Sequence, residues 1–119
     1  MNLSLPNFKR TFFASLVLCF SIQSFAATQA VTAKISRTLA GSGWGGCMIA
    51  LDVAFVAPCP ATGWVSLDCD GLYVDAVAGN NQFSSALTAF SMDKTVVVYA
   101  SDTNFSGGYC SVFRIDVIK

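Results

Sequence analysis

Cys110, in the stretch SGGYCSVFRIDV near the end of the chain, is the residue best suited by type to act as a nucleophile. A cysteine attacks a substrate as the thiolate, which an adjacent base or positive charge must stabilise. The chain contains no histidine, so the usual base is missing. We therefore expect Cys110 to hold the fold together as one half of a disulfide.

Carboxylates offer a second route to catalysis. The chain has no glutamate, so every acidic side chain is an aspartate, and Asp68 and Asp70 stand two residues apart in the segment DCDG. Such a pair could serve carboxylate-assisted hydrolysis or begin a calcium loop, but the later calcium ligands are missing. A pair followed by glycine is typical of a solvated strand end. We expect no catalytic residue, no metal site and no cofactor, and keep a small hydrolase as a remote alternative.

Residues 1–26 have the pattern of a secretory signal peptide. Basic residues at 9 and 10 precede an apolar run over 12–22, which is about half the length that a membrane-spanning helix needs. Ser24-Phe25-Ala26 then places small residues at the positions that a signal peptidase reads. We expect cleavage before Ala27, leaving one small domain over 27–119 that is periplasmic or secreted and is not held by a membrane.

Residues 27–119 carry five basic residues against seven aspartates, a formal charge of minus two. A slightly acidic domain with few charges offers no cationic face to phosphates, so we expect no nucleic-acid partner. The apolar residues that dominate the composition must enter a core, a subunit interface, or both.

The elements that must position these residues follow from the apolar periodicity. Strict alternation predicts strands over 30–39, 47–56 and 63–69, separated by turns rich in glycine and proline. Phe83, Leu87 and Phe90 recur at helical spacing, with Asn80 or Asn81 as the N-cap. The β-branched run over 95–100 predicts a buried fourth strand, and 109–117 a fifth. In the fifth strand we expect one face to pack in the core and the other to point outward. The inward set is Tyr109, Phe113, Ile115 and Val117, and the outward set is Val112, Arg114 and Asp116.

Three strands, a helix and two further strands follow one another in the order of an OB-fold, a five-stranded barrel. We predict a mainly β fold with one helix, an OB-like β-β-β-α-β-β barrel. The alternative is an open α+β antiparallel sheet with one covering helix.

Four cysteines remain after the leader, and an even number in a short exported chain predicts two disulfides with three possible pairings. Zinc is disfavoured because the chain has no histidine and no C-x-x-C pair. The strand pattern favours Cys59 with Cys69, as an adjacent hairpin contact. It then joins Cys47 to Cys110, at the starts of the second and fifth strands.

The blocks GGCMIAL, WVSLDCDG, FSSALTAF, KTVVVYASD and GGYCSVFRIDV resemble the recurrent segments of a family of small, exported, uncharacterised bacterial proteins, a domain of unknown function. The resemblance covers most of residues 27–119 and implies a periplasmic or secreted bacterial protein, without implying an activity. The expected architecture alone is similar to the OB-fold B subunits of AB5 toxins, which bind glycans. None of their sequence motifs is matched, so no binding residue carries over.

Aromatic side chains in loops and at sheet edges are the candidates for ligand or partner contact, since such rings stack on sugars or pack against proteins. The candidate contact residues are Trp44, Trp64, Tyr73, Phe105 and Arg114. The alternative for the rings is that they close a small core, and for Arg114 a surface pair with Asp116 or Asp52. We predict a non-enzymatic binding or interaction module that binds a protein partner or itself, with carbohydrate binding through Trp44, Trp64 or Tyr73 as the alternative.

Overall fold

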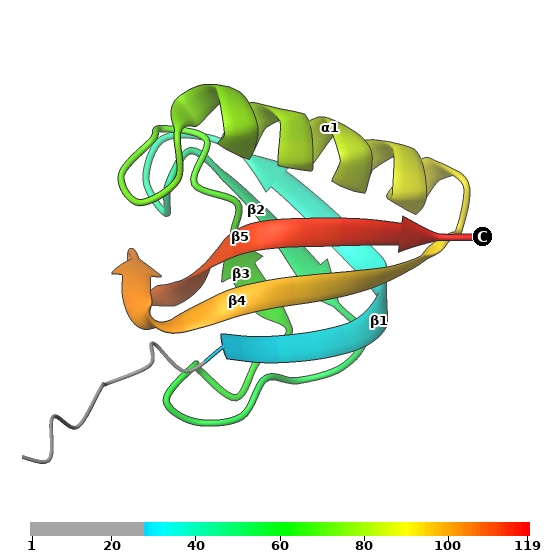
Figure 1. Cartoon of the computed structure of the whole chain (residues 1–119), viewed down its shortest axis with the longest axis horizontal. Coiled ribbons are helices and arrows are strands. Elements are labelled where there is room, and N and C mark those ends of the chain that lie inside the picture. Colours follow the sequence, from blue (N-terminus) through cyan, green and yellow to red (C-terminus); the bar gives the residue numbers. More distant parts are fainter. Residues whose placement is uncertain (1–27) are drawn as a thin grey trace, which may run out of the picture.

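The computed structural model describes residues 28–119, so the predicted signal peptide lies outside the described residues. Five strands and one helix follow one another in the predicted order, with the helix between the third and fourth strands (Figure 1). The elements are β1 (Thr28–Ala40), β2 (Cys47–Leu51), β3 (Trp64–Ser66), α1 (Ala76–Ser91), β4 (Thr95–Ser106) and β5 (Tyr109–Ile118).

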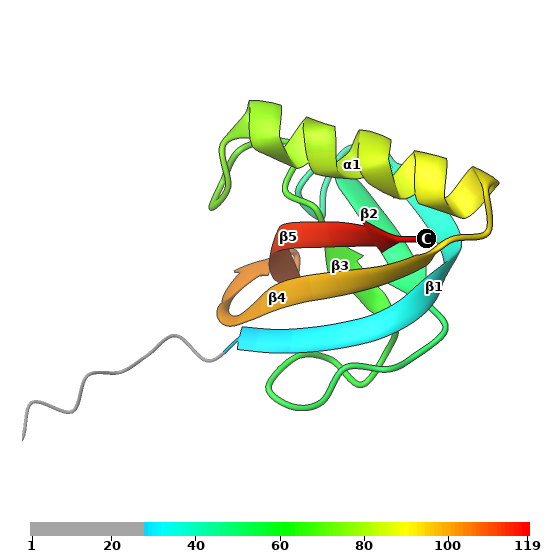
Figure 2. The same ribbon diagram turned by 45° about the vertical axis from the view of Figure 1, so that its right-hand side comes forward.

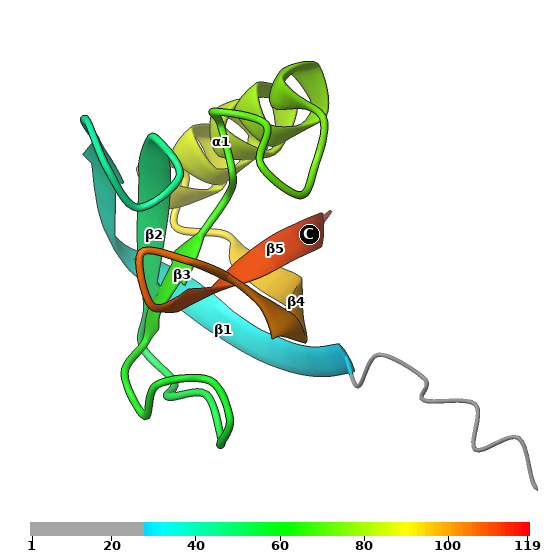
Figure 3. The same cartoon turned by 90° about the vertical axis from the view of Figure 1, so that its left-hand side faces the viewer.

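The strands form one mixed sheet in the order β1-β2-β3-β5-β4 that closes in a ring, because β4 pairs with both β5 and β1 (Figures 1 and 3). Neighbouring strands are antiparallel except β3 and β5, which run parallel and meet at Ser66 and Ser111. The prediction of a mainly β fold with one helix is confirmed. The alternative of an open antiparallel sheet is wrong.

β1 is long enough to serve two neighbours. Its first half pairs with β4 from Thr28 to Lys34, and its second half pairs with β2 from Ile35 onward. A bulge between Ile35 and Arg37 lies at the change of partner. Bulges bend and twist a strand, which is how a single strand turns the corner of a small closed sheet.

β2 and β3 are shorter than predicted. The chain leaves β2 after Leu51 and returns at Gly63, whose carbonyl accepts a 2.8 Å hydrogen bond from the Leu51 amide. A Cβ at Gly63 would overlap the Leu51 carbonyl, so only glycine allows the backbones to approach this closely. Val53, which lies within the predicted strand over 47–56, is therefore exposed in the connecting loop, whereas Phe55 is buried there.

α1 covers one side of the ring, as Figure 2 shows, and begins earlier than predicted. Asp75, rather than Asn80 or Asn81, is the N-cap, and its carboxylate accepts a hydrogen bond from the Ala78 amide. Of the residues at the predicted helical spacing, only Phe83 packs against the core, whereas Leu87 and Phe90 are 40% and 44% exposed. A Cβ at Gly79 would overlap the Asp68 carbonyl, so the backbone of the ring lies very close to the start of α1. Small residues therefore fill the contact, and they are Gly79, Ala86 and Ala89.

A bulge in β5 corrects the predicted faces of that strand. Ala100 pairs with Val112 and Tyr99 with Arg114, so Phe113 is the extra residue. The bulge reverses the alternation, which buries Val112 completely and leaves Phe113 46% exposed. Ile115 packs on the core, but Val117 is 44% exposed.

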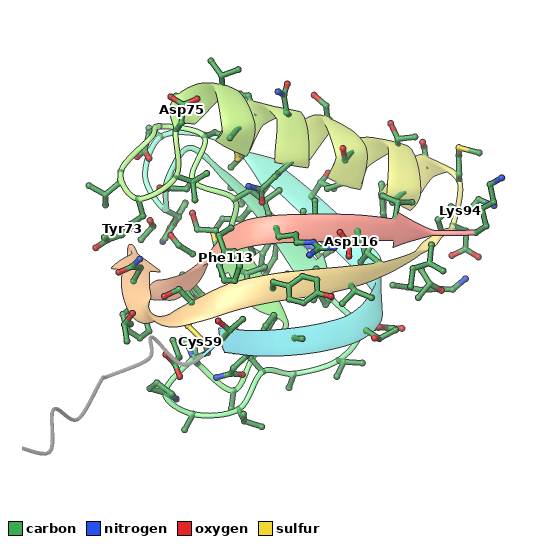
Figure 4. All side chains as sticks on the ribbon, viewed as in Figure 1. Cys59, Tyr73, Asp75, Lys94, Phe113 and Asp116 are labelled. Carbon is green, nitrogen blue, oxygen red and sulfur yellow. A yellow bond between two sulfur atoms is a disulfide. The ribbon has the colours of Figure 1, made fainter. Side chains whose placement is uncertain are left out.

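The prediction of two disulfides is confirmed and the predicted pairing is wrong. Cys47 is joined to Cys69, and Cys59 to Cys110. The β2–β3 register explains the first pair, because the Leu67 amide bonds to the Cys47 carbonyl and so brings the end of the hairpin back to its start. Cys59, labelled in Figure 4, lies in the β2–β3 loop and is bonded to Cys110, the second residue of β5. Each bridge therefore ties a loop segment to the start of a strand.

Candidate functional site

Asp68 is a fully buried carboxylate just after the end of β3. Its Oδ2 accepts hydrogen bonds from the amides of Tyr73 at 2.5 Å and Val74 at 2.6 Å, and its Oδ1 accepts one from Ser106 Oγ at 3.3 Å. The expected solvated pair of Asp68 and Asp70 is thus wrong for Asp68, although Asp70 is exposed. A carboxylate enclosed by its own donors fixes the backbone around it and is not free to act on a substrate.

Buried serines extend this network to the neighbouring loops. Ser106 Oγ lies 3.2 Å from Ser111 Oγ, which joins the β4–β5 turn to β5. Ser66 Oγ accepts from the Asp68 amide at 3.1 Å and donates to the Trp44 carbonyl at 2.8 Å. The network therefore holds two surface hollows from below, one beside Tyr73 and one beside Trp44.

The larger hollow, which we call the Tyr73 groove, has a volume of about 280 Å³. Figure 4 shows two of its side chains, Tyr73 and Phe113, at the same end of the molecule. Their exposed fractions are 47% and 46%, so both rings are open to solvent. The lining residues are Thr28, Tyr73, Val74, Ser101, Asn104, Ser111 and Phe113. The lining contains hydroxyl groups and one carboxamide but no charged side chain.

The polar groups of the Tyr73 groove differ in how far they are already engaged. Ser111 bonds to Ser106, and Ser101 Oγ lies 3.1 Å from Thr103 Oγ1. Within residues 28–119, no hydrogen bond engages the Asn104 carboxamide, whereas the Asn104 backbone amide donates to Ser101 Oγ at 3.3 Å. The carboxamide is thus held on an ordered backbone and is available to a ligand as both donor and acceptor.

The smaller hollow, which we call the Trp44 groove, lies on the outer face of β2 and β3 and has a volume of about 100 Å³. Five residues from four strands and a loop line it: Leu39, Trp44, Met48, Trp64 and Tyr109. The structure thus brings together two predicted contact residues, Trp44 and Trp64. Tyr109, predicted to face the core, lines this groove instead, because it precedes the inward-facing Cys110.

Glycines make the position of Trp44 possible. Trp44 itself has φ of 50°, and a Cβ at its neighbour Gly45 would overlap Ser66 Oγ. Across the groove, a Cβ at Gly107 in the β4–β5 turn would overlap Cδ1 of the Trp44 ring. The ring therefore packs directly against the backbone of the turn, which is the close approach that glycine allows.

Arg37 extends the aromatic layer along β1. Its guanidinium carbon lies 5.3 Å from the centroid of the Trp64 ring, within the range of a cation–π interaction. Arg37 pairs with Ala50, and Ala50 with Trp64, so the three side chains lie in one row across the sheet. Met48 and Ala50 are only 3% and 6% exposed although they point away from the core, because this layer covers them.

Phe105 and Arg114 line neither groove. Phe105, predicted in a loop, lies in β4 and packs against the core. Arg114 makes two 2.9 Å hydrogen bonds to the Asp116 carboxylate and lies 4.9 Å from the centroid of the Tyr99 ring. The hydrogen bonds that Arg114 donates to Asp116, together with the negative charge of Asp116, raise the pKa of Arg114 above its usual value. Both residues have their partners within the domain.

Among the lining residues that were not predicted as contacts, three carry a ring or a carboxamide: Asn104, Tyr109 and Phe113. The fifth strand holds a signal for Tyr109 and Phe113. Cys110 and Val112 at even positions and Ile115 at an odd position all face the core, although regular alternation would place even and odd positions on opposite faces. Only a bulge between them reconciles the two sets. For Asn104 the sequence offers no comparable signal, because its carboxamide faces a groove formed by segments distant in the chain.

Across residues 28–119, no group of three or more histidine, cysteine or acidic side chains is arranged to hold a metal ion. In the same part of the chain, no helix has the length and apolar character needed to cross a bilayer. No protein-family model, curated protein or solved structure matches this chain.

Proposed function

We propose that this protein is an exported, non-enzymatic binding module that binds a neutral glycan in the Tyr73 groove. The observation that carries the proposal is the pairing of two half-exposed rings, Tyr73 and Phe113, with uncharged hydrogen-bonding groups around one hollow. The two disulfides indicate an oxidising environment outside the cytoplasm, which supports export through the predicted signal peptide to the periplasm or the medium.

The chemistry of a sugar matches the lining of this groove. A pyranose ring has an apolar C–H face that packs against an aromatic ring, while its hydroxyl groups need donors and acceptors at the rim. Tyr73 and Phe113 supply the rings, and Asn104 and Thr28 supply polar groups at the rim. The volume of about 280 Å³ is near the lower end of small-ligand pockets, which begin at about 300 Å³. One terminal sugar residue is the ligand of suitable size.

The buried network supports binding by holding the groove in place before the ligand arrives. Asp68 fixes the Tyr73 and Val74 amides, and Ser106 fixes Ser111. A preorganised site loses less conformational entropy on binding. This role also explains why a charged residue is buried in so small a domain.

The strand order and the position of α1 support the finer description of the ring as an OB-like barrel. In OB-folds the face of strands 2 and 3 and the adjoining loops bind oligosaccharides or nucleic acids, which here corresponds to the Trp44 groove. By that analogy alone, the glycan would be expected to bind in the Trp44 groove. The Trp44 groove is lined by two indoles, the Tyr109 ring, a thioether and an aliphatic side chain, and it offers fewer groups that match sugar hydroxyls than the Tyr73 groove does.

Saturation-transfer NMR of the mature domain with a panel of neutral monosaccharides and disaccharides tests the proposal. We expect at least one sugar to bind and Phe113→Ala to weaken its affinity about fivefold, since stacking on one ring contributes about 1 kcal/mol. Phe90→Ala is the matched control, because it removes a ring of similar exposure outside the groove. Absence of any bound sugar, or an equal effect of the two variants, would refute glycan binding at this site.

Self-association is the second candidate function, and exposed apolar side chains on α1 and β5 support it. These side chains are 40% to 59% exposed, and they are Leu87, Phe90, Met92, Val117 and Ile118. A concentration of exposed apolar residues on a weakly charged domain is typical of an interaction surface. Sedimentation velocity should show a dimer or larger assembly that Leu87→Lys dissociates. A wild-type monomer at high concentration would exclude this candidate.

A further inference from the structure

The Trp44 groove combines aromatic rings in a way that the proposed glycan site does not use. Three rings from three separate segments, Trp44, Trp64 and Tyr109, surround one hollow above the buried thioether of Met48. An uncharged lining of this kind gives an ordinary polar ligand little to bind. The faces of the rings, however, carry the negative part of the aromatic quadrupole.

Aromatic faces attract cations, and this surface already holds one. The Arg37 guanidinium lies 5.3 Å from the Trp64 centroid, although Arg37 is not among the residues that line the hollow. A quaternary ammonium is the cation best suited to the hollow itself. Its methyl groups pack against apolar atoms, and it has no N–H groups that would be left without acceptors there.

The size of the hollow agrees with such a group. Its volume of about 100 Å³ suits a compact trimethylammonium group. The Tyr73 groove has nearly three times this volume. The two grooves therefore select ligands of different size as well as different chemistry.

Arg37 decides what else the ligand must carry. A simple cation in the hollow would be repelled by the guanidinium on the neighbouring part of Trp64. A ligand that also bears an anionic group would turn this repulsion into a charge-assisted hydrogen bond. The ligand class that satisfies both the rings and Arg37 is a small zwitterion with a quaternary ammonium next to an anion.

We propose that the Trp44 groove binds a soluble phosphocholine-type zwitterion, with the trimethylammonium group among Trp44, Trp64 and Tyr109 and the phosphate on Arg37. A soluble source is favoured over a lipid bilayer because the hollow has room for one headgroup, and its five lining residues leave no further apolar surface for acyl chains. This inference is independent of glycan binding, since the two sites share no lining residue.

Tryptophan fluorescence tests the proposal directly, because Trp44 and Trp64 are the two tryptophans of the chain. Phosphocholine should shift the emission of the mature domain in a saturable way, with choline binding more weakly and phosphoethanolamine weaker still. Tyr109→Leu should weaken phosphocholine binding threefold to thirtyfold, roughly the range of a cation–π contact. Tyr99→Leu is the matched control, because it removes a ring that pairs with a cation, Arg114, elsewhere on the surface.

Arg37→Gln distinguishes the contribution of the phosphate group to binding from that of the trimethylammonium group. This variant should lower the affinity for phosphocholine to that for choline while choline binding stays equal or improves. A loss of binding to both ligands to the same extent would contradict the role given to Arg37. No fluorescence change with phosphocholine or choline at 10 mM, roughly the weak limit of specific binding, would overturn the proposal altogether. Binding to phosphatidylcholine vesicles without binding to free phosphocholine would overturn the soluble source.

Discussion

The Tyr73 groove and the Trp44 groove are built on one buried network but have opposite surface chemistry. The first is wide and lined by hydroxyls, a carboxamide and two rings, whereas the second is narrow and lined by three rings, a thioether and an aliphatic side chain. The Asp68 carboxylate supports the Tyr73 groove by accepting hydrogen bonds from the Tyr73 and Val74 amides. The Asp68 backbone amide supports the Trp44 groove by donating to Ser66, which in turn donates to the Trp44 carbonyl. The difference shows how a small domain can hold two distinct surfaces with a single set of buried polar groups.

The largest expected effect comes from removing the disulfide between Cys59 and Cys110. Tyr109 and Ser111, which flank Cys110 in the chain, line the Trp44 and Tyr73 grooves respectively. Replacing both Cys59 and Cys110 by alanine should lower the free energy of unfolding by about 4 kcal/mol, because the bridge closes a long loop in the unfolded chain. Urea denaturation measures the loss. A peptide map of the unreduced wild type should show Cys59 joined to Cys110, and any other pairing would contradict the structure.

Asp68→Asn should weaken the Tyr73 groove directly and reach the Trp44 loop only through Ser106, whose hydroxyl donates to the Asp68 carboxylate. The amide loses the charge that strengthens its hydrogen bonds to two backbone amides, at a cost of about 2 kcal/mol in unfolding free energy. Asp70→Asn is the control, since this neighbour is exposed and should have almost no effect. Chemical-shift changes in NMR spectra should reach residues of both grooves. Changes confined to the Tyr73 groove would show that the Trp44 loop is held without the network.

Gly107→Ala should impair the Trp44 groove without affecting the Tyr73 groove. Gly107 has φ of 58° and lies against the Trp44 ring, so an added methyl group costs about 1 kcal/mol and displaces the indole. Ligand binding in the Trp44 groove should fall, while sugar binding in the Tyr73 groove stays unchanged. Gly108→Ala has the same kind of backbone strain, with φ of 88°, but nothing within 4 Å of the new methyl group. Equal effects of the two variants on Trp44 fluorescence would contradict the packing argument.

Arg114→Gln should have the smallest effect. Arg114 is exposed and pairs with Asp116 outside both grooves. Since Asp116 raises the pKa of Arg114 above an already high value, the guanidinium of Arg114 stays charged and introduces no pH dependence of its own. Thermal melting and both ligand titrations should match the wild type. A loss of binding in either titration would show that Arg114 contacts a ligand after all.

The order of elements could be predicted because it depends on local patterns. Alternation in 30–39, the β-branched run at 95–100 and the helical spacing within 83–90 each specify an element without reference to the rest of the chain. The faces of these elements were harder to predict. Leu87 and Phe90 belong to the apolar repeat that indicates the helix, yet they are exposed, because the buried contacts of α1 are made by Gly79, Ala86 and Ala89.

The candidate sites were predictable only in part, for the same reason. Trp44, Trp64 and Tyr73 were expected as contacts because rings in loops and at sheet edges often bind ligands, and all three line a groove. Their division between two sites depends on strand pairing, which no single segment specifies. Phe113 joined Tyr73 only because a bulge reversed the alternation of β5.

The sequence by itself determined the mainly β class, the single helix between the third and fourth strands, and the use of four cysteines in two disulfides. Cys110 is one of these four, and its sulfur is bonded to Cys59 rather than free. Only the tertiary structure decided which cysteines pair, why Asp68 is buried, and which rings share a groove. These outcomes depend on the register between distant strands and on how closely two backbones approach. Both are set by packing across the whole ring rather than by the residues of any one segment.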